Sequence, residues 1–171
     1  MKIAILGFSG SGKSTLAKFL SEHYSLPLLY LDTVQFEENW VVRPQEEKEK
    51  MLAAFMAQHD SWVIDGNYTK LYQSERLEAA DMIVLLCFNR FACLARALRR
   101  HRTYRGRVRE SIAPGCKEKM DAEFVLWILH GGRKRAARQR YRDIQNKYRD
   151  KCTVIKNQRQ LNAFYASFRE N

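Results

Sequence analysis

The stretch Lys2-Ile-Ala-Ile-Leu6-Gly7-Phe-Ser-Gly-Ser-Gly12-Lys13-Ser14-Thr15 decides the fold of this chain. Residues 2–6 form a short apolar run that is partly β-branched, which is typical of a buried strand. In the segment that follows, residues 13–24, the side chains of Leu16, Phe19 and Leu20 recur at helical spacing. The stretch therefore predicts a strand, a glycine-rich loop and a helix, in that order.

The loop between this strand and this helix matches the pattern GxxxxGK[ST], and it stands where that motif has to stand to bind phosphate. Glycines let backbone N–H groups converge on phosphate oxygens, and the positive end of the helix dipole points to the same place. We predict that Lys13 contacts the β and γ phosphates of ATP, that Ser14 ligates Mg²⁺ and that Thr15 contacts a more internal phosphate. The complete predicted nucleotide-binding loop comprises Gly7, Ser9, Gly10, Ser11, Gly12, Lys13, Ser14 and Thr15.

The rest of the chain alternates short apolar runs with helical patterns. Such near-continuous apolar runs suit a parallel sheet that is covered on both faces. The pattern predicts one doubly wound α/β domain over residues 1–171. Its further strands are expected at 28–31, 62–64, 82–88 and 153–155, and helices at 44–59 and 158–168.

Two carboxylates follow predicted strands directly. Asp32 follows the second strand and Asp65 the third, at the edge where open α/β sheets bind ligands. A carboxylate at position 32 would accept a hydrogen bond from an acceptor hydroxyl and help to remove its proton. The structural alternatives are a helix N-cap for Asp32 and a turn before Gly66 for Asp65.

The positive charge of the chain is concentrated in one segment. The net charge is +11, and residues 90–142 hold 16 Lys or Arg against four acidic residues. Helical patterns in this region break at Gly106, at Pro114-Gly115 and at Gly131-Gly132. We predict a mobile basic lid over residues 100–142 that binds an anion, either nucleotide phosphates or a nucleic-acid backbone.

Length and composition restrict the remaining possibilities. A chain of 171 residues with 46% hydrophobic residues suits one domain, and no apolar run approaches the roughly 20 residues that span a bilayer. The sequence therefore predicts a cytoplasmic protein without a membrane partner. Its cysteines lack metal-ligand or CxxC spacing and are expected to be free thiols; they are Cys87, Cys93, Cys116 and Cys152.

A family resemblance adds to these predictions. The phosphate loop, Leu31-Asp32 and residues 62–68 resemble small-molecule and nucleotide kinases of the adenylate and shikimate kinase type. With residues 104–109, 114–118 and 121–124 included, the chain resembles the bacterial DNA topology modulation proteins, which are relatives of adenylate kinase, nearly from end to end. The resemblance implies a P-loop NTPase three-layer sandwich with sheet order 2-3-1-4-5, and the use of ATP and Mg²⁺.

The same resemblance assigns roles to single residues. It places Asp65 beside Mg²⁺ with Ser14, and Asp32 at the acceptor. It also implies that Arg96 or Arg100 supports the adenine and phosphates. Asn67-Tyr68 stand where nucleoside monophosphate kinases typically have an arginine after Asp-Gly, which counts against such an acceptor. The lid arginines expected to close over the γ phosphate are Arg105, Arg109 and Arg138, and the aromatic candidates for the acceptor pocket are Trp40, Tyr68, Phe124 and Trp127.

The function predicted from these features is a kinase that transfers the γ-phosphoryl group of Mg-ATP to a small-molecule or nucleotide-like acceptor. One alternative is an ATP-dependent regulator that binds nucleic acid through the basic segment, and another is a plain ATPase. Nucleic-acid readers usually add a helix-turn-helix, RRM or OB pattern to their basic charge, and the sequence has none of these. We therefore expect only weak nucleic-acid binding; the sequence does not indicate an oligomeric state.

Overall fold

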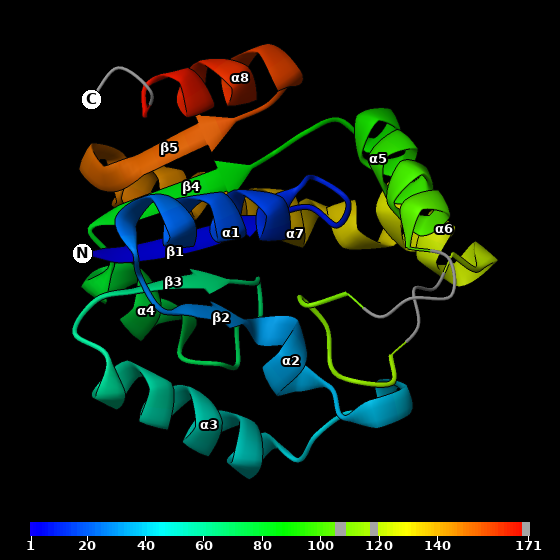
Figure 1. The fold of residues 1–171 in the computed structure, drawn as a ribbon. Coiled ribbons are helices and arrows are strands. Elements are labelled where there is room, and N and C mark those ends of the chain that lie inside the picture. The colour runs from blue at the N-terminus through cyan, green and yellow to red at the C-terminus, as the bar shows by residue number, and fades with distance from the viewer. Residues whose placement is uncertain (105–108, 117–119, 169–171) are drawn as a thin grey trace.

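A five-stranded, all-parallel sheet forms the centre of the computed structural model, which describes residues 1–104, 109–116 and 120–168 (Figure 1). The order of the strands is β2-β3-β1-β4-β5, which confirms the predicted fold class and strand order. All strands run in one direction, so their carboxyl ends meet at the right-hand edge in Figure 1. The strands are β1 (Lys2–Gly7), β2 (Leu28–Tyr30), β3 (Trp62–Asp65), β4 (Met82–Leu86) and β5 (Cys152–Ile155).

Helices cover both faces of the sheet. Helices α1 and α8 lie on one face, where Phe19 packs edge-on against Tyr165 at 4.7 Å between ring centroids. Helices α4 and α7 lie on the other face and are joined by an ion pair between Glu78 and Lys147. The helices are α1 (Lys13–Tyr24), α2 (Leu31–Gln35), α3 (Gln45–Gln58), α4 (Gln73–Ala79), α5 (Arg90–Thr103), α6 (Ala122–Leu129), α7 (Arg135–Lys147) and α8 (Gln158–Ala166), with 3₁₀ turns η1 (Glu38–Trp40), η2 (Gly131–Arg133) and η3 (Arg149–Lys151).

The core lies on both sides of the two central strands. Residues 3–6 of β1 and 83–86 of β4 are completely buried, and Ala4 pairs with Ile64 on one side and Ile83 on the other. This burial explains why the two strands are apolar without alternation. The phosphate loop thus begins at the end of a rigid central strand, which fixes its position.

The second strand is shorter than the sequence predicts. Strand β2 ends at Tyr30, and residues 31–35 form the short helix α2, so Asp32 lies in the first turn of a helix. The backbone N–H of Phe36 donates to the carbonyl of Asp32, which closes this helix. Helices of five to seven residues, such as α2 and α4, are too short to show a clear apolar period, so the sequence did not indicate them.

The segment predicted to be a lid divides into two parts. Helix α7 belongs to the domain itself, because Tyr141 and Ile144 are buried and the Tyr141 ring packs edge-on against Phe8 at 5.0 Å. Helices α5 and α6 lie at the carboxyl edge of the sheet. Any closing movement is therefore expected before residue 134 only. Arg105 and the predicted break at Gly106 lie outside the described residues.

No helix in the described part of the chain is both long enough and apolar enough to cross a membrane. All four cysteines are free thiols, and two of them, Cys93 and Cys116, are buried.

Candidate functional site

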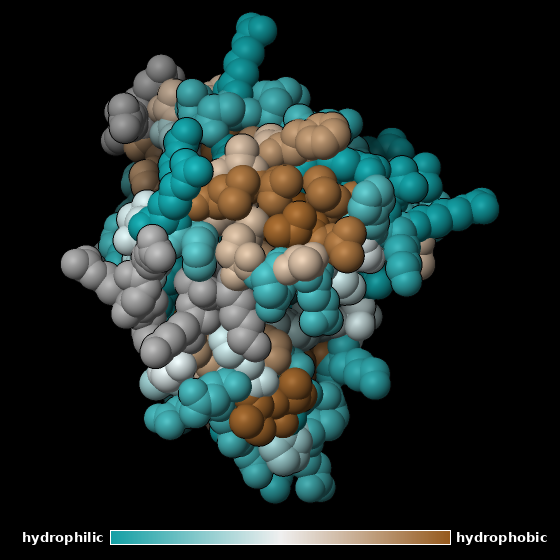
Figure 2. All heavy atoms as spheres, turned by 90° about the vertical axis from the view of Figure 1, so that its right-hand side faces the viewer, coloured by the Kyte–Doolittle hydropathy of each residue, from teal (hydrophilic) through white to brown (hydrophobic). Residues whose placement is uncertain are grey.

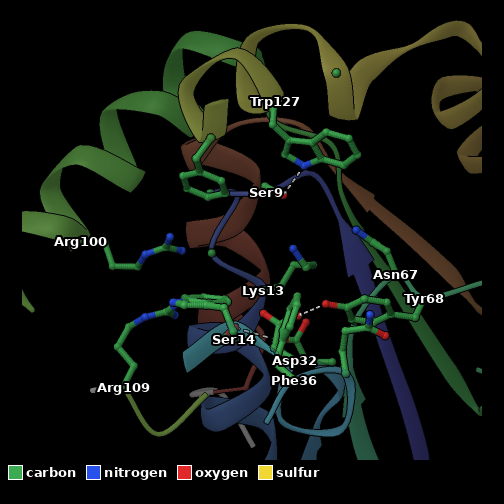
Figure 3. A pocket seen from close by; sticks show the side chains of 18 of the residues that line it. Ser9, Lys13, Ser14, Asp32, Phe36, Asn67, Tyr68, Arg100, Arg109 and Trp127 are labelled. Atoms are coloured by element: carbon green, nitrogen blue, oxygen red, sulfur yellow. Dashed lines mark hydrogen bonds between the residues drawn. The ribbon is translucent and has the colours of Figure 1, made fainter. Parts of the chain in front are cut away.

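A cavity of about 1470 Å³ opens at the carboxyl edge of the sheet, directly over the phosphate loop (Figure 3). The loop and the start of α1 line one side of it through Ser9, Gly10, Gly12, Lys13, Ser14 and Thr15. Gly7 and Ser11 lie behind this surface. The opposite side is formed by α2, α3 and the loop after β3, with Asp32, Gln35, Lys48 and Tyr68 among its lining residues.

The backbone of the phosphate loop requires its glycines. Gly10 and Gly12 have φ angles of 77° and 97°, in the left-handed region that favours glycine. A Cβ atom on Gly10 would lie 2.5 Å from the carbonyl oxygen of Cys93, so only glycine fits against α5 at this position. The Lys13 Nζ donates to the carbonyl of Phe8 at 3.3 Å, which holds the ammonium over the loop. This conformation suits the binding of phosphate oxygens.

Ser14 and Asp65 form a pair beside the loop. The Ser14 hydroxyl donates to Asp65 Oδ2 at 2.7 Å, while Asp65 Oδ1 is buried and has no hydrogen-bond partner within the described residues. The pKa of Asp65 is raised to about 6: burial is the largest cause and the nearby charge of Asp32 adds to it, while Lys13, the Ser14 hydrogen bond and Arg109 act in the opposite direction. A buried carboxylate oxygen without a donor indicates a missing cationic or donor ligand.

These residues fit a magnesium ion bound together with ATP. Mg²⁺ in nucleotide sites is held by one or two protein oxygens, by phosphates and by water, rather than by a complete protein cage. Accordingly, the described residues contain no group of three or more His, Cys, Asp or Glu side chains that could hold a metal. Ser14 Oγ and the Asp65 carboxylate would supply the protein oxygens.

Asp32 lines the same cavity close to Ser14 and is oriented by Tyr68. The Tyr68 hydroxyl donates to Asp32 Oδ1 at 2.6 Å. Burial raises the pKa of Tyr68, and the charge and hydrogen bond of Asp32 raise it further, so the tyrosine remains a donor at physiological pH. The loop that carries Tyr68 is held from below by the buried guanidinium of Arg76, which donates to the carbonyls of Leu71 and Tyr68.

Asn67 fixes the start of the phosphate loop. Its Oδ1 accepts from the backbone N–H of Gly7 at 2.9 Å, and its Nδ2 donates to the carbonyl of Gly7 at 2.7 Å. In turn, Gln73 donates to the backbone carbonyl of Asn67 at 2.8 Å. The amide of Asn67 thereby satisfies both backbone groups of Gly7, as a neighbouring strand would do. It also connects the loop after β3 to the phosphate loop.

We expect the Asn67→Ala variant to weaken ATP binding about tenfold and to lower stability by about 1–3 kcal/mol, because both backbone groups of Gly7 lose their partner. Isothermal titration with a nonhydrolysable ATP analogue and chemical denaturation would measure the two effects. Asn146→Ala, at an exposed position of α7 outside the cavity, is a matched control that removes an amide without contact to the loop. Unchanged affinity in a stable Asn67→Ala protein would show that the loop keeps its shape without this clamp.

The predicted arginines occupy different places. Arg96 donates to the carbonyl of Ser11 at 2.6 Å and to Gln158, and it stacks on the Phe88 ring at 4.0 Å. Arg100 and Arg109 line the cavity and point into it from α5 and from the segment after it (Figure 3). Arg138 lines a second cavity on another part of the surface, together with Phe91. The structure therefore brings Arg96, Arg100 and Arg109 to the phosphate loop and does not bring Arg138 there.

Apolar side chains of α6 form one rim of the cavity. Leu126 and Trp127 line it, although they are 59% and 52% exposed, and the Trp127 Nε1 donates to Ser9 Oγ at 3.3 Å. Figure 2 looks onto this edge of the molecule and shows the apolar patch over α6 in its upper half (Figure 2). The four aromatic residues that the sequence suggested all lie in the cavity lining: Trp40, Tyr68, Phe124 and Trp127.

Several residues that shape the site were not identified from the sequence. Lys48 gave a weak signal, since it lies one helical turn before the buried Leu52 and therefore on the buried face of α3. The buried Arg76 gave no signal, because nothing in its sequence context distinguishes it from a solvent-exposed helical arginine.

Comparisons with known proteins describe the fold and do not extend to function. No protein-family model matches the chain, and no curated protein is significantly similar to it in sequence. An uncharacterized protein from Eubacterium ventriosum is 16% identical, with 91% of this chain and 89% of that chain covered and a TM-score of 0.43. A gluconokinase from Sinorhizobium meliloti is 17% identical, with 91% and 81% covered and a TM-score of 0.46. Both are distant likenesses of fold, and the resemblance to DNA topology modulation proteins stays a prediction.

Proposed function

We propose that this protein is a phosphotransferase that uses Mg-ATP to phosphorylate a hydroxyl group of a small acceptor. The observation that carries the proposal is the buried Asp65 Oδ1, which has no hydrogen-bond partner in the described part of the chain. It lies beside Ser14 at the phosphate loop, in the cavity that Asp32 also lines. A phosphate-binding loop, a metal-binding pair and a candidate base on one cavity are the parts that phosphoryl transfer requires.

Each residue of the cavity would have a separate role in the reaction. The loop backbone and Lys13 hold the β and γ phosphates, and Ser14 with Asp65 holds Mg²⁺, which supplies charge neutralisation on the phosphate oxygens. Asp32, oriented by Tyr68, accepts the proton of the acceptor hydroxyl. The hydroxyl oxygen forms a bond to the γ phosphorus, the bond from that phosphorus to the bridging oxygen of ADP breaks, and ADP leaves.

Arg100 and Arg109 supply further positive charge. Both point into the cavity that Lys13 faces, where charge builds up on the transferring phosphoryl oxygens. A guanidinium contacts two of these oxygens at once, which an ammonium does not do in the same geometry. The Arg109 charge also contributes to keeping Asp65 ionised, which favours metal binding.

The test is a set of reactions with Mg-ATP and a panel of nucleosides, nucleotides, sugars, polyols and hydroxy acids, with ADP and phosphorylated product measured by mass spectrometry. The proposal expects ADP formation well above the background without acceptor, and one phosphoryl group on the product. Equal ADP formation with and without every acceptor would indicate a plain ATPase. No ADP formation, together with salt-sensitive binding of duplex DNA, would favour the nucleic-acid regulator.

Asp32 is the proposed base that takes the proton of the acceptor hydroxyl. We expect Asp32→Asn to reduce kcat about 100-fold or more and to change the affinity for ATP less than about threefold. An amide still accepts the hydrogen bond from Tyr68 but does not take a proton from the acceptor. Steady-state kinetics and ATP-analogue titration separate the two effects. Asp81→Asn removes an exposed carboxylate at the opposite edge of the sheet and serves as control. Full turnover in Asp32→Asn would limit Asp32 to a structural role.

A further inference from the structure

Lys48 is a buried cation in the wall of the cavity. It lies on α3, is 7% exposed and lines the same cavity as Asp32 and Tyr68. Its Nζ donates to Gln35 Oε1 at 3.3 Å, which is a long hydrogen bond to a neutral group. An ammonium has three donors, so this contact leaves most of its hydrogen-bonding capacity for a ligand.

No ion pair with another described residue compensates the charge of Lys48. Within residues 1–104, 109–116 and 120–168, no carboxylate lies within ion-pair distance of its Nζ. The nearby Arg43 differs, since it pairs with Glu37 at 3.3 Å and with Glu47 at 3.8 Å. A buried charge without a counter-charge is unfavourable unless a ligand supplies one. The cavity therefore presents a cation that favours an anionic group on whatever occupies it.

The position of this cation relative to Asp32 restricts the ligand further. Gln35, which contacts Lys48, lies three residues after Asp32 on α2. Side chains at this spacing are neighbours on a helix surface, with Cβ atoms about 5–6 Å apart. Lys48 and Asp32 are therefore both linked to α2 and line one cavity, so one acceptor molecule with an anionic group and a hydroxyl fits both. Lys70, which is exposed, adds positive charge to the same cavity wall.

We infer that Lys48 binds an anionic group of the phosphoryl acceptor, so that the acceptor is a small hydroxy compound that carries a phosphate or a carboxylate. This inference rests on the proposed phosphotransferase function and specifies its substrate class. Neutral sugars and polyols lack the group that Lys48 requires. The binding of the anionic group holds the hydroxyl against Asp32, which contributes orientation to the reaction.

The kinetic test compares matched acceptors: ribose with ribose 5-phosphate, and glycerol with glycerate. We expect kcat/KM to be about 100-fold higher for the anionic member of an accepted pair than for the neutral member. In Lys48→Met this ratio should be at least about tenfold smaller. The phosphate and carboxylate pairs distinguish the two kinds of anion. Lys50→Met, an exposed lysine on the same helix, is the matched control and should leave the preference unchanged. A preference for neutral acceptors, or an equal preference in the parent and Lys48→Met, overturns the inference.

A binding test gives a result that does not depend on turnover. The protein is saturated with a nonhydrolysable Mg-ATP analogue, which fills the phosphate loop, and inorganic phosphate is then titrated by calorimetry. We expect Lys48→Met to weaken phosphate binding about tenfold, and Lys50→Met to leave it unchanged. Lys48-dependent phosphate binding without phosphorylation of any acceptor would support the anion site while the proposed transferase activity fails. Equal binding in the parent and Lys48→Met would overturn the anion site itself.

Stability measurements on Lys48 variants test whether Lys48 has only a structural role. Methionine has a similar length and no charge, so Lys48→Met should melt at or above the temperature of the parent, because a buried unpaired charge is removed. A melting temperature lower by more than about 5 °C would mean that Lys48 stabilises the fold, and it would overturn the inference. Lys48→Arg, which keeps the charge, should retain the preference for anionic acceptors better than Lys48→Met does.

Discussion

The Lys13→Ala variant is expected to lose at least about 1000-fold in turnover while it keeps the fold of the parent. The ammonium at this position neutralises charge on the transferring phosphoryl group, whereas Arg100 and Arg109 reach the cavity from α5 and the segment after it. Among the described residues, the Lys13 side chain makes one hydrogen bond, a long one to the carbonyl of Phe8. Its removal is therefore expected to change the free energy of unfolding by less than about 1 kcal/mol.

Turnover is measured with the acceptor found in the panel assay, and folding by circular dichroism and thermal melting. Lys18→Ala is the matched control, because it removes a lysine from the same helix at an exposed position outside the cavity. We expect Lys18→Ala to keep full turnover. A folded Lys13→Ala protein with the rate of the parent would contradict both the phosphate-loop assignment and the proposed function.

The phosphate loop and the Ser14–Asp65 pair could be predicted from sequence because both depend on local signals. The glycine pattern, the strand before it and the helix after it lie within one short stretch. Asp65 closes the strand that pairs with β1, and parallel neighbours end at the same edge of the sheet. The resemblance to adenylate and shikimate kinases supplied the strand order, which places β3 beside β1.

The contribution of single side chains to the far wall of the cavity could not be predicted. Lys48 lines the cavity because of how α3 packs against α2, and no local pattern specifies that packing. Arg138 and Arg109 were equally plausible as lid arginines from charge alone. Their separation arises because Tyr141 and Ile144 anchor α7 on the sheet, which directs Arg138 to a different cavity.

The Asp65→Asn variant is expected to show two effects of opposite sign: a loss of about 100-fold or more in turnover and a gain in stability at pH 8. Burial holds the pKa of Asp65 near 6, above its ordinary value of 3.8, so the folded state favours the protonated form. The stabilisation from this preference is complete below pH 4 and is lost as the pH rises through 6. At pH 8 the ionised Asp65 therefore destabilises the free protein, by an amount on the order of 2–3 kcal/mol.

An asparagine at this position keeps an oxygen for the Ser14 hydroxyl and carries no charge at any pH, so it removes the penalty together with the metal-binding carboxylate. Denaturant unfolding without Mg²⁺ at pH 4, 6 and 8 should show that Asp65→Asn exceeds the parent most at pH 8 and least at pH 4. The turnover of the parent should fall as the pH drops through 6, because protonated Asp65 binds Mg²⁺ poorly. Asp60→Asn, at an exposed turn before β3, should change neither quantity. If Asp65→Asn keeps full turnover, or if its stability relative to the parent does not change with pH, then Asp65 is not a buried, metal-binding carboxylate but part of the turn before Gly66.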